Sequence, residues 1–157
     1  MHSHIAVVRI RGRSGVQKQV NDTLDMMRLY KQNGCVVVPN TPMYLGMIRK
    51  AKDYITWGEI DPETLTLLLQ KRAKIVGDKP LTEEYLKDKL KVDAKGFAHE
   101  ILAGTRALKD VPGIKPYFRL MPPSKGFERS GIKRAFAVGG ALGYRKDKIN
   151  DLIKRML

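Results

Sequence analysis

The fold is decided by residues 4–60, which read HIAVVRIRGRSGVQKQVNDTLDMMRLYKQNGCVVVPNTPMYLGMIRKAKDYITWGEI. The segment opens with HIAVVRIR, whose alternating pattern predicts a β-strand with neighbouring side chains on opposite faces. One face is apolar throughout, and we expect it to lie in the core. The other face ends in Arg9 and Arg11, so we expect its far end to leave the protein interior. The apolar face consists of Ala6, Val8 and Ile10.

A helix and a second strand are predicted next. Apolar residues recur at helical spacing after the turn GRSG. Ser14 followed by Gln17 fits a capping box, which predicts a helix that begins near Ser14, and Asn33-Gly34 predicts its end. The apolar run CVVV, residues 35–38, predicts a short strand that is buried on both faces.

A second helix and a third strand complete this segment. Thr41 is an expected N-cap, and Pro42 suits the first helical position because its missing N–H would have had no partner there. ITWGEI, residues 55–60, is the expected third strand. Residues 1–60 are therefore predicted to form a β-α-β-α-β unit, a compact sheet covered by two helices on one face.

The remainder of the chain is predicted to add a helical extension and a basic C-terminal segment. Residues 61–112 carry three helix patterns, which begin near Asp61, at Thr82 and before Phe97. Residues 113–157 are predicted to pack back on the core as a strand, a glycine-rich loop and a final helix. We place the strand at 117–121, the loop at 122–143 with a short strand at 132–138, and the helix at about 145–156.

Composition points to a polyanionic partner. The chain has 157 residues, a formal net charge of +14 and 43% hydrophobic residues, so it can bury a core while it carries a large excess of positive charge. No stretch approaches the roughly 18 apolar residues of a membrane span, and no secretory signal is visible. The one cysteine, Cys35, lies in an apolar run and is expected to be a small buried hydrophobe. We expect a cytoplasmic protein.

The positive charge is concentrated at the two ends of the chain. Residues 1–60 carry a net +5 and residues 111–157 a net +8, whereas residues 61–110 carry a net +1. This asymmetry predicts that both ends fold onto one partner-facing side. The middle of the chain would then face solvent or another protein.

Two basic clusters are the strongest candidates for a binding site. Arginine can pair bidentately with a phosphate and lysine adds a point charge, so we interpret the clusters as contacts to a nucleic-acid backbone. The second cluster lies on the glycine-rich loop, which is suited to an irregular RNA surface. Arg145 and Lys146, before the final helix, are further candidates. The first cluster is Arg9, Arg11, Arg13 and Lys18, and the second is Lys125, Arg129, Lys133 and Arg134.

Signals for an enzyme are weak. The three histidines, His2, His4 and His99, form no set with zinc spacing, so no metal site is predicted. GGALG at 139–143 is not followed by Gly-Lys-Ser/Thr, so nucleotide binding is not predicted. We expect no cofactor, no catalytic residue and no small-molecule substrate. A small basic protein that compacts DNA remains the main alternative to an RNA-binding protein.

Three segments resemble one known family. VVRIRG (7–12), NTPMYLGMIRKAKDYITWGEI (40–60) and GYRKDKINDLIKRML (143–157) closely resemble ribosomal large-subunit protein thirty in its archaeal form. The resemblance covers nearly the whole chain, and the order and spacing of the segments also fit.

The resemblance implies an α+β fold in which the β-α-β-α-β core is a ferredoxin-like half with a three-stranded antiparallel sheet. It implies a structural constituent of the large ribosomal subunit that binds 23S-type rRNA near the 5S rRNA region, as a monomer beside neighbouring ribosomal proteins and without catalysis. Contact with 5S rRNA itself is a further possibility. In the family, RNA contact is associated with the loop after the first strand and the start of the second helix. The matching residues here are Arg11, Arg13, Lys18, Thr41 and Arg49.

Overall fold

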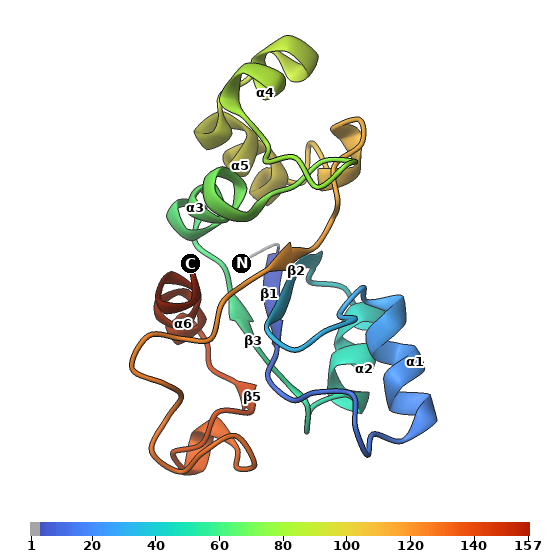
Figure 1. The fold of residues 1–157 in the computed structure, drawn as a ribbon, viewed down its shortest axis with the longest axis vertical. Coiled ribbons are helices and arrows are strands. Elements are labelled where there is room, and N and C mark those ends of the chain that lie inside the picture. Colours follow the sequence, from blue (N-terminus) through green and yellow to red (C-terminus); the bar gives the residue numbers. More distant parts are fainter. Residues whose placement is uncertain (1–3) are drawn as a thin grey trace.

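A computed structural model describes residues 4–157 and shows an α+β fold built on one mixed sheet (Figure 1). The strand order is β4-β2-β1-β3-β5. The three central strands are antiparallel, β4 joins β2 antiparallel, and β5 joins β3 parallel. The strands are β1 (His4–Arg9), β2 (Gly34–Pro39), β3 (Ile55–Glu59), β4 (Phe118–Arg119) and β5 (Gly143–Tyr144).

The three-stranded sheet implied by the resemblance is therefore extended at both edges. The two added strands are two residues long, and both come from the C-terminal segment. The predicted β-α-β-α-β core is confirmed as the centre of the fold.

Helices cover both faces of the sheet (Figure 1). One face packs on the first two helices through a core that includes Ile5 and Val7. The opposite face packs on α3, α5 and α6 through a core that includes Ala6 and Val8. The helices are α1 (Lys18–Met26), α2 (Pro42–Lys50), α3 (Pro62–Arg72), α4 (Glu83–Leu90), α5 (Ala94–Ala103) and α6 (Lys148–Met156).

The central strand β1 is buried on both faces, which corrects one expectation. The sequence predicted that the face ending in arginine would leave the interior. Instead Arg9 is completely buried at the end of β1, and only Arg11, beyond the end of the strand, is partly exposed. Helices on both sides of the sheet explain this result, because neither face of β1 is left to solvent.

Local signals predicted some helix ends correctly and others incorrectly. The hydroxyl of Thr41 accepts a hydrogen bond from the N–H of Tyr44 at 3.5 Å, so the predicted cap of α2 is confirmed. Ser14 does not cap α1, which begins at Lys18 after Gln17 and has no side-chain cap. The same helix ends at Met26, well before the predicted end at Asn33-Gly34.

The C-terminal segment departs from prediction in one element. The short strand expected at 132–138 is absent, and a 3₁₀ turn at Phe136–Val138 stands there. The strand lies further on, at β5. The final helix is confirmed, with a fully buried stripe of Ile149, Leu152, Ile153 and Met156.

Cys35 is completely buried, as predicted from its apolar neighbourhood. Burial raises the pKa of its thiol to about 12, so the thiolate is suppressed at neutral pH. Cys35 is therefore a packing residue and offers no nucleophile.

Candidate nucleic-acid interface

Arg9 shapes the loop that follows β1. Its guanidinium donates from Nε to the carbonyl of Arg11 at 2.8 Å, from Nη1 to that of Leu29 at 2.6 Å, and from Nη2 to that of Gly12 at 3.1 Å. A completely buried side chain presents no surface to a phosphate. We therefore assign Arg9 to holding the loop in shape, and we remove it from the candidate RNA contacts.

The N-terminal loop, residues 10–17, carries two of the predicted contacts. The backbone N–H of Arg11 donates to the carbonyl of Tyr54 at 3.2 Å, and its guanidinium lies 4.9 Å from the centre of the Tyr54 ring. Arg13 is exposed and pairs with Asp25 at 2.9 Å. An exposed pair of this kind contributes about 0–1 kcal/mol, so Arg13 can exchange its partner for a phosphate at little cost.

Arg145, the other buried arginine, organises the C-terminal loop, residues 122–143. Its side chain is 1% exposed. Nε donates to Thr56 Oγ1 and Nη2 to the carbonyl of Ala141, both at 2.8 Å. The two Nη atoms pair with the carboxylate of Glu128, and the guanidinium lies over the ring of Phe136. Arg145 therefore fastens both halves of this loop to β3, and it too is removed from the candidate contacts.

Glu128 is the one acidic residue of the C-terminal loop. Its carboxylate also approaches Arg155 at 3.6 Å. Burial raises the pKa of Glu128, but hydrogen bonds from Arg145 and from its own backbone N–H, with the charges of Arg145 and Arg155, outweigh burial and leave the pKa below its ordinary value. Glu128 is therefore ionised at neutral pH, and the buried Arg145 compensates its negative charge. The charge that the loop presents outward is positive.

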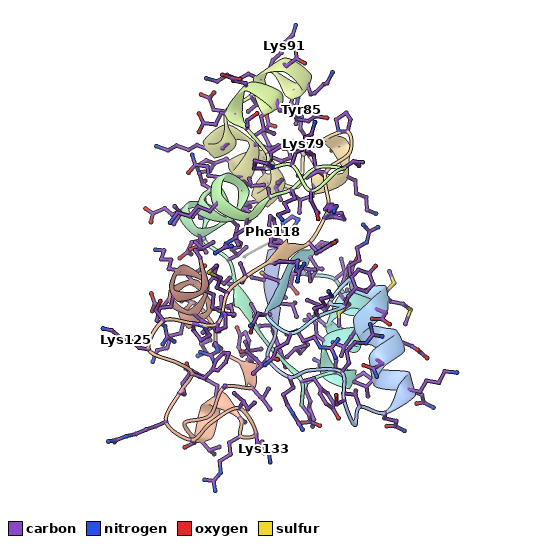
Figure 2. All side chains as sticks on the ribbon, in the orientation of Figure 1. Lys79, Tyr85, Lys91, Phe118, Lys125 and Lys133 are labelled. Atoms are coloured by element: carbon purple, nitrogen blue, oxygen red, sulfur yellow. The ribbon has the colours of Figure 1, made fainter. Side chains whose placement is uncertain are left out.

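The four cations predicted on the C-terminal loop are exposed. Within residues 4–157, no ion pair joins any of them to an acid. Figure 2 shows Lys133 at the lower end of the molecule and Lys125 higher up on one flank, both pointing outward. The four are Lys125, Arg129, Lys133 and Arg134.

A close backbone approach fixes part of this loop. A Cβ on Gly140 would lie 2.1 Å from the carbonyl oxygen of Arg134, so no larger residue fits there without moving Arg134. The same carbonyl accepts a hydrogen bond from the N–H of Leu142 at 3.1 Å. The glycines thus let the loop fold closely on itself.

Both loops are attached near the start of β3, one to Tyr54 just before the strand and the other to Thr56 within it. Tyr54 holds the N-terminal loop through its carbonyl and ring. Two residues further on, the hydroxyl of Thr56 donates to the carbonyl of Gly143 at 2.8 Å and accepts from Arg145. Segments more than 100 residues apart in sequence are therefore both held at one end of the sheet. In Figure 1 both loops lie at the lower end of the molecule.

The end of α2 adds cations that the sequence reasoning missed. Arg49, in the last turn of α2, is exposed as predicted for a contact, and so are Lys50 and Lys52 after it. The run RKAK at 49–52 is the sequence signal for these cations, and it lies outside the two predicted basic clusters. The turn that contains Lys52 leads directly into β3, between the two loops.

Thr41 does not join this group. It lies at the other end of α2 from Arg49, about 12 Å away at the helical rise of 1.5 Å per residue.

Lys18 opens α1 and is exposed beside the N-terminal loop, and Lys146 is exposed in the turn between β5 and α6. We define the cationic surface as the exposed and partly exposed basic residues of the two loops, of the start of α1 and of the end of α2. They are Arg11, Arg13, Lys18, Arg49, Lys50, Lys52, Lys125, Arg129, Lys133 and Arg134.

The described residues show neither a metal-binding cluster nor a membrane-spanning helix. Between His4 and Leu157, no three His, Cys, Asp or Glu side chains lie close enough together to hold a metal ion. His2 lies outside the described residues. In the same range no helix has the length and apolar character needed to cross a membrane.

Comparison with known proteins identifies the family. Residues 5–55 match the family model described as Ribosomal protein L30p/L7e. The chain is 52% identical over 152 residues to large ribosomal subunit protein uL30 of Methanococcus vannielii, which covers 97% of this chain and 98% of the relative. It is 51% identical over 152 residues to uL30 of Nanoarchaeum equitans, covering 97% of each, and 45% identical over 149 residues to uL30 of Methanopyrus kandleri, covering 94% of this chain and all of the relative.

These matches assign the chain to the ribosomal proteins, a structural class and not a class of enzymes. Within that class, the chain belongs to the uL30 family of the large ribosomal subunit. The alternative of a DNA-compacting protein receives no support from any of these relatives.

Proposed function

We propose that the chain binds folded 23S-type rRNA through the cationic surface, near the 5S rRNA region of the large subunit. It acts there as a monomer in cytoplasmic ribosomes, beside neighbouring ribosomal proteins and without a cofactor or a substrate. The observation that carries the proposal is the attachment of two cationic loops to Tyr54 and Thr56, at one end of the sheet.

The proposed mechanism is electrostatic and steric. Folding brings the phosphates of separate RNA helices together, and their mutual repulsion opposes that approach. Basic side chains placed between the helices lower the repulsion and release condensed counterions. Contacts of this kind fix position and carry no sequence information, so RNA shape should dominate over base identity.

The buried arginines determine where those charges stand. A cation on a free loop must lose conformational freedom when it binds, which reduces the net gain. Here Arg9 fixes the carbonyls of the N-terminal loop and Arg145 fixes the C-terminal loop before any RNA arrives. The surface is therefore pre-organised, and less of the electrostatic gain is lost to ordering.

Salt dependence is the first test of this function. We expect affinity for a folded fragment of large-subunit rRNA to fall by roughly 0.7–0.9 log units per log unit of salt for each phosphate contact. The measurement is a titration of the labelled fragment at several salt concentrations, with duplex DNA of equal length as competitor. An affinity that does not change with salt, or equal competition by the duplex, would contradict the proposal.

A further inference from the structure

A second basic region lies at the opposite edge of the sheet, beside β4. A hollow of about 170 Å³ opens there between the segment after α1 and the strand pair β2–β4. None of its lining residues belongs to the cationic surface. Phe118, labelled in Figure 2, is the position on β4 between two of them. The lining consists of Arg28, Tyr30, Lys31, Gly34, Tyr117 and Arg119.

The hollow contains an aromatic pair with open ring surface. Tyr30 is 42% exposed, which is high for a residue of its size. Its ring centre lies 5.9 Å from that of Tyr117, and the two rings are nearly perpendicular at 85°. An edge-to-face contact of this kind is favourable and fixes the ring orientation. The Tyr30 ring is therefore fixed in orientation by Tyr117 and still partly exposed to solvent, so it can serve as a stacking platform.

The charged side chains that line the hollow are all positive. Arg28, Lys31 and Arg119 are exposed, and the lining of the hollow contains no carboxylate. In the part of the chain that the structure describes, none of the three forms a salt bridge. Their charges are therefore available to an anionic partner.

The backbone at Arg28 adds a second observation. Arg28 follows the end of α1 with a φ of 63°, a left-handed conformation in which glycine is the usual residue. The N–H of Leu29 donates to the carbonyl of Leu24 at 2.8 Å, which closes the helix end around this residue. A glycine would satisfy that backbone better but would place no cation at the hollow. The turn at the end of α1 therefore places the Arg28 side chain in the lining of the hollow.

We propose that this hollow binds one unpaired nucleotide of structured RNA, with its base stacked on Tyr30. The flanking phosphates lie against Arg28, Lys31 and Arg119. Stacking suits any base because every base has a π-face, and arginine and lysine supply the phosphate contacts. The volume is below the roughly 300–1,000 Å³ of pockets that enclose whole ligands, which fits a single base. This inference rests on the proposed function and adds a specific subsite to it.

The test compares two hairpin RNAs with equal numbers of phosphates. One carries a single bulged 2-aminopurine, and the other carries an abasic nucleotide at the same place. We expect the protein to bind the first about tenfold more tightly and to quench its fluorescence, since stacking contributes substantially per base. Tyr30→Phe should keep this preference. Tyr30→Leu should abolish it, so that both hairpins bind with the affinity of the abasic one.

The outcomes separate this inference from the proposed function. Equal binding of the two hairpins by the unmodified protein overturns the subsite and leaves general RNA binding intact. Failure to bind either hairpin or the rRNA fragment contradicts the proposed function itself. If Tyr30→Leu keeps the preference for the base but loses incorporation into large subunits, the hollow contacts a protein neighbour and the RNA assignment is overturned. Thermal unfolding of each variant establishes that it is folded.

Discussion

Replacing Lys125, Arg129, Lys133 and Arg134 by alanine is expected to weaken binding to the rRNA fragment on the order of 10²- to 10³-fold at about 0.1 M salt. Each lost phosphate contact should also lower the salt dependence by about 0.7–0.9 log units per log unit of salt. The four side chains are exposed and unpaired with acids, so the free protein should keep its stability within about 0.5 kcal/mol per position. The measurements are affinity against salt and thermal unfolding.

A matched variant separates position from total charge. Lys71, Lys79, Lys91 and Lys95 are also exposed and form no ion pair with any residue between 4 and 157, and Figure 2 shows Lys79 and Lys91 at the upper end, far from Lys133. Alanine at these four positions gives the same net charge of +10. We expect that variant to keep most of its affinity for the rRNA fragment. Counterions are released from RNA only where a basic side chain contacts a phosphate, and these four lysines lie away from the proposed contacts. Equal losses in the two variants would show that net charge alone determines binding.

Arg145→Met is expected to destabilise the protein by about 3 kcal/mol, since removing one partner of a buried ion pair leaves the other uncompensated. Glu128 is 20% exposed and keeps Arg155 nearby, which places the effect at the lower end of the usual range. For a domain of this size the midpoint of thermal unfolding should fall by roughly 6–12 °C. RNA affinity should fall as well, although Arg145 itself does not contact RNA. Without Arg145 the C-terminal loop is no longer held in one conformation, so its exposed cations are no longer fixed in position.

Two further variants make this prediction specific. Arg134→Met removes an exposed arginine from the same loop and should change stability by less than about 0.5 kcal/mol. Combining Arg145→Met with Glu128→Gln should restore part of the lost stability, because the stranded carboxylate is then removed. If Arg145→Met unfolds at the same temperature as the unmodified protein, Arg145 does not hold the loop.

Local signals in the sequence predicted the elements that depend on local physics. Thr41 and Pro42 mark the start of α2 because capping involves groups within one turn of a helix. The stripe from Ile149 to Met156 predicted α6 because one face of that helix is buried along its whole length. The charge asymmetry likewise identified both ends of the chain as basic segments, and each of them is attached near the start of β3.

Long-range contacts explain what the sequence did not reveal. The sequence predicts surface contacts for Arg9, in the first basic cluster, and for Arg145, before the final helix. Their burial depends on partners that are distant in sequence: Leu29 lies 20 residues from Arg9, and Thr56 lies 89 residues from Arg145. No local pattern predicts such partners.

Contacts between residues distant in sequence also account for β5 and for the hollow beside Tyr30. β5 is two residues long and exists because Gly143 meets Thr56 across the sheet. Gly58 allows that part of the chain to approach, since a Cβ there would lie 2.0 Å from the carbonyl oxygen of Lys146. Tyr30 contacts Tyr117 because β4, which follows Tyr117, pairs with β2.

Hydrogen exchange of the protein, free and bound to the rRNA fragment, tests the central claim most directly. If two pre-organised loops form one RNA-binding surface, amides in residues 10–17 and 122–143 should both be protected on binding, while those of α4 should exchange as in the free protein. Protection confined to α4 and its surroundings, or to one loop without the other, would contradict the account.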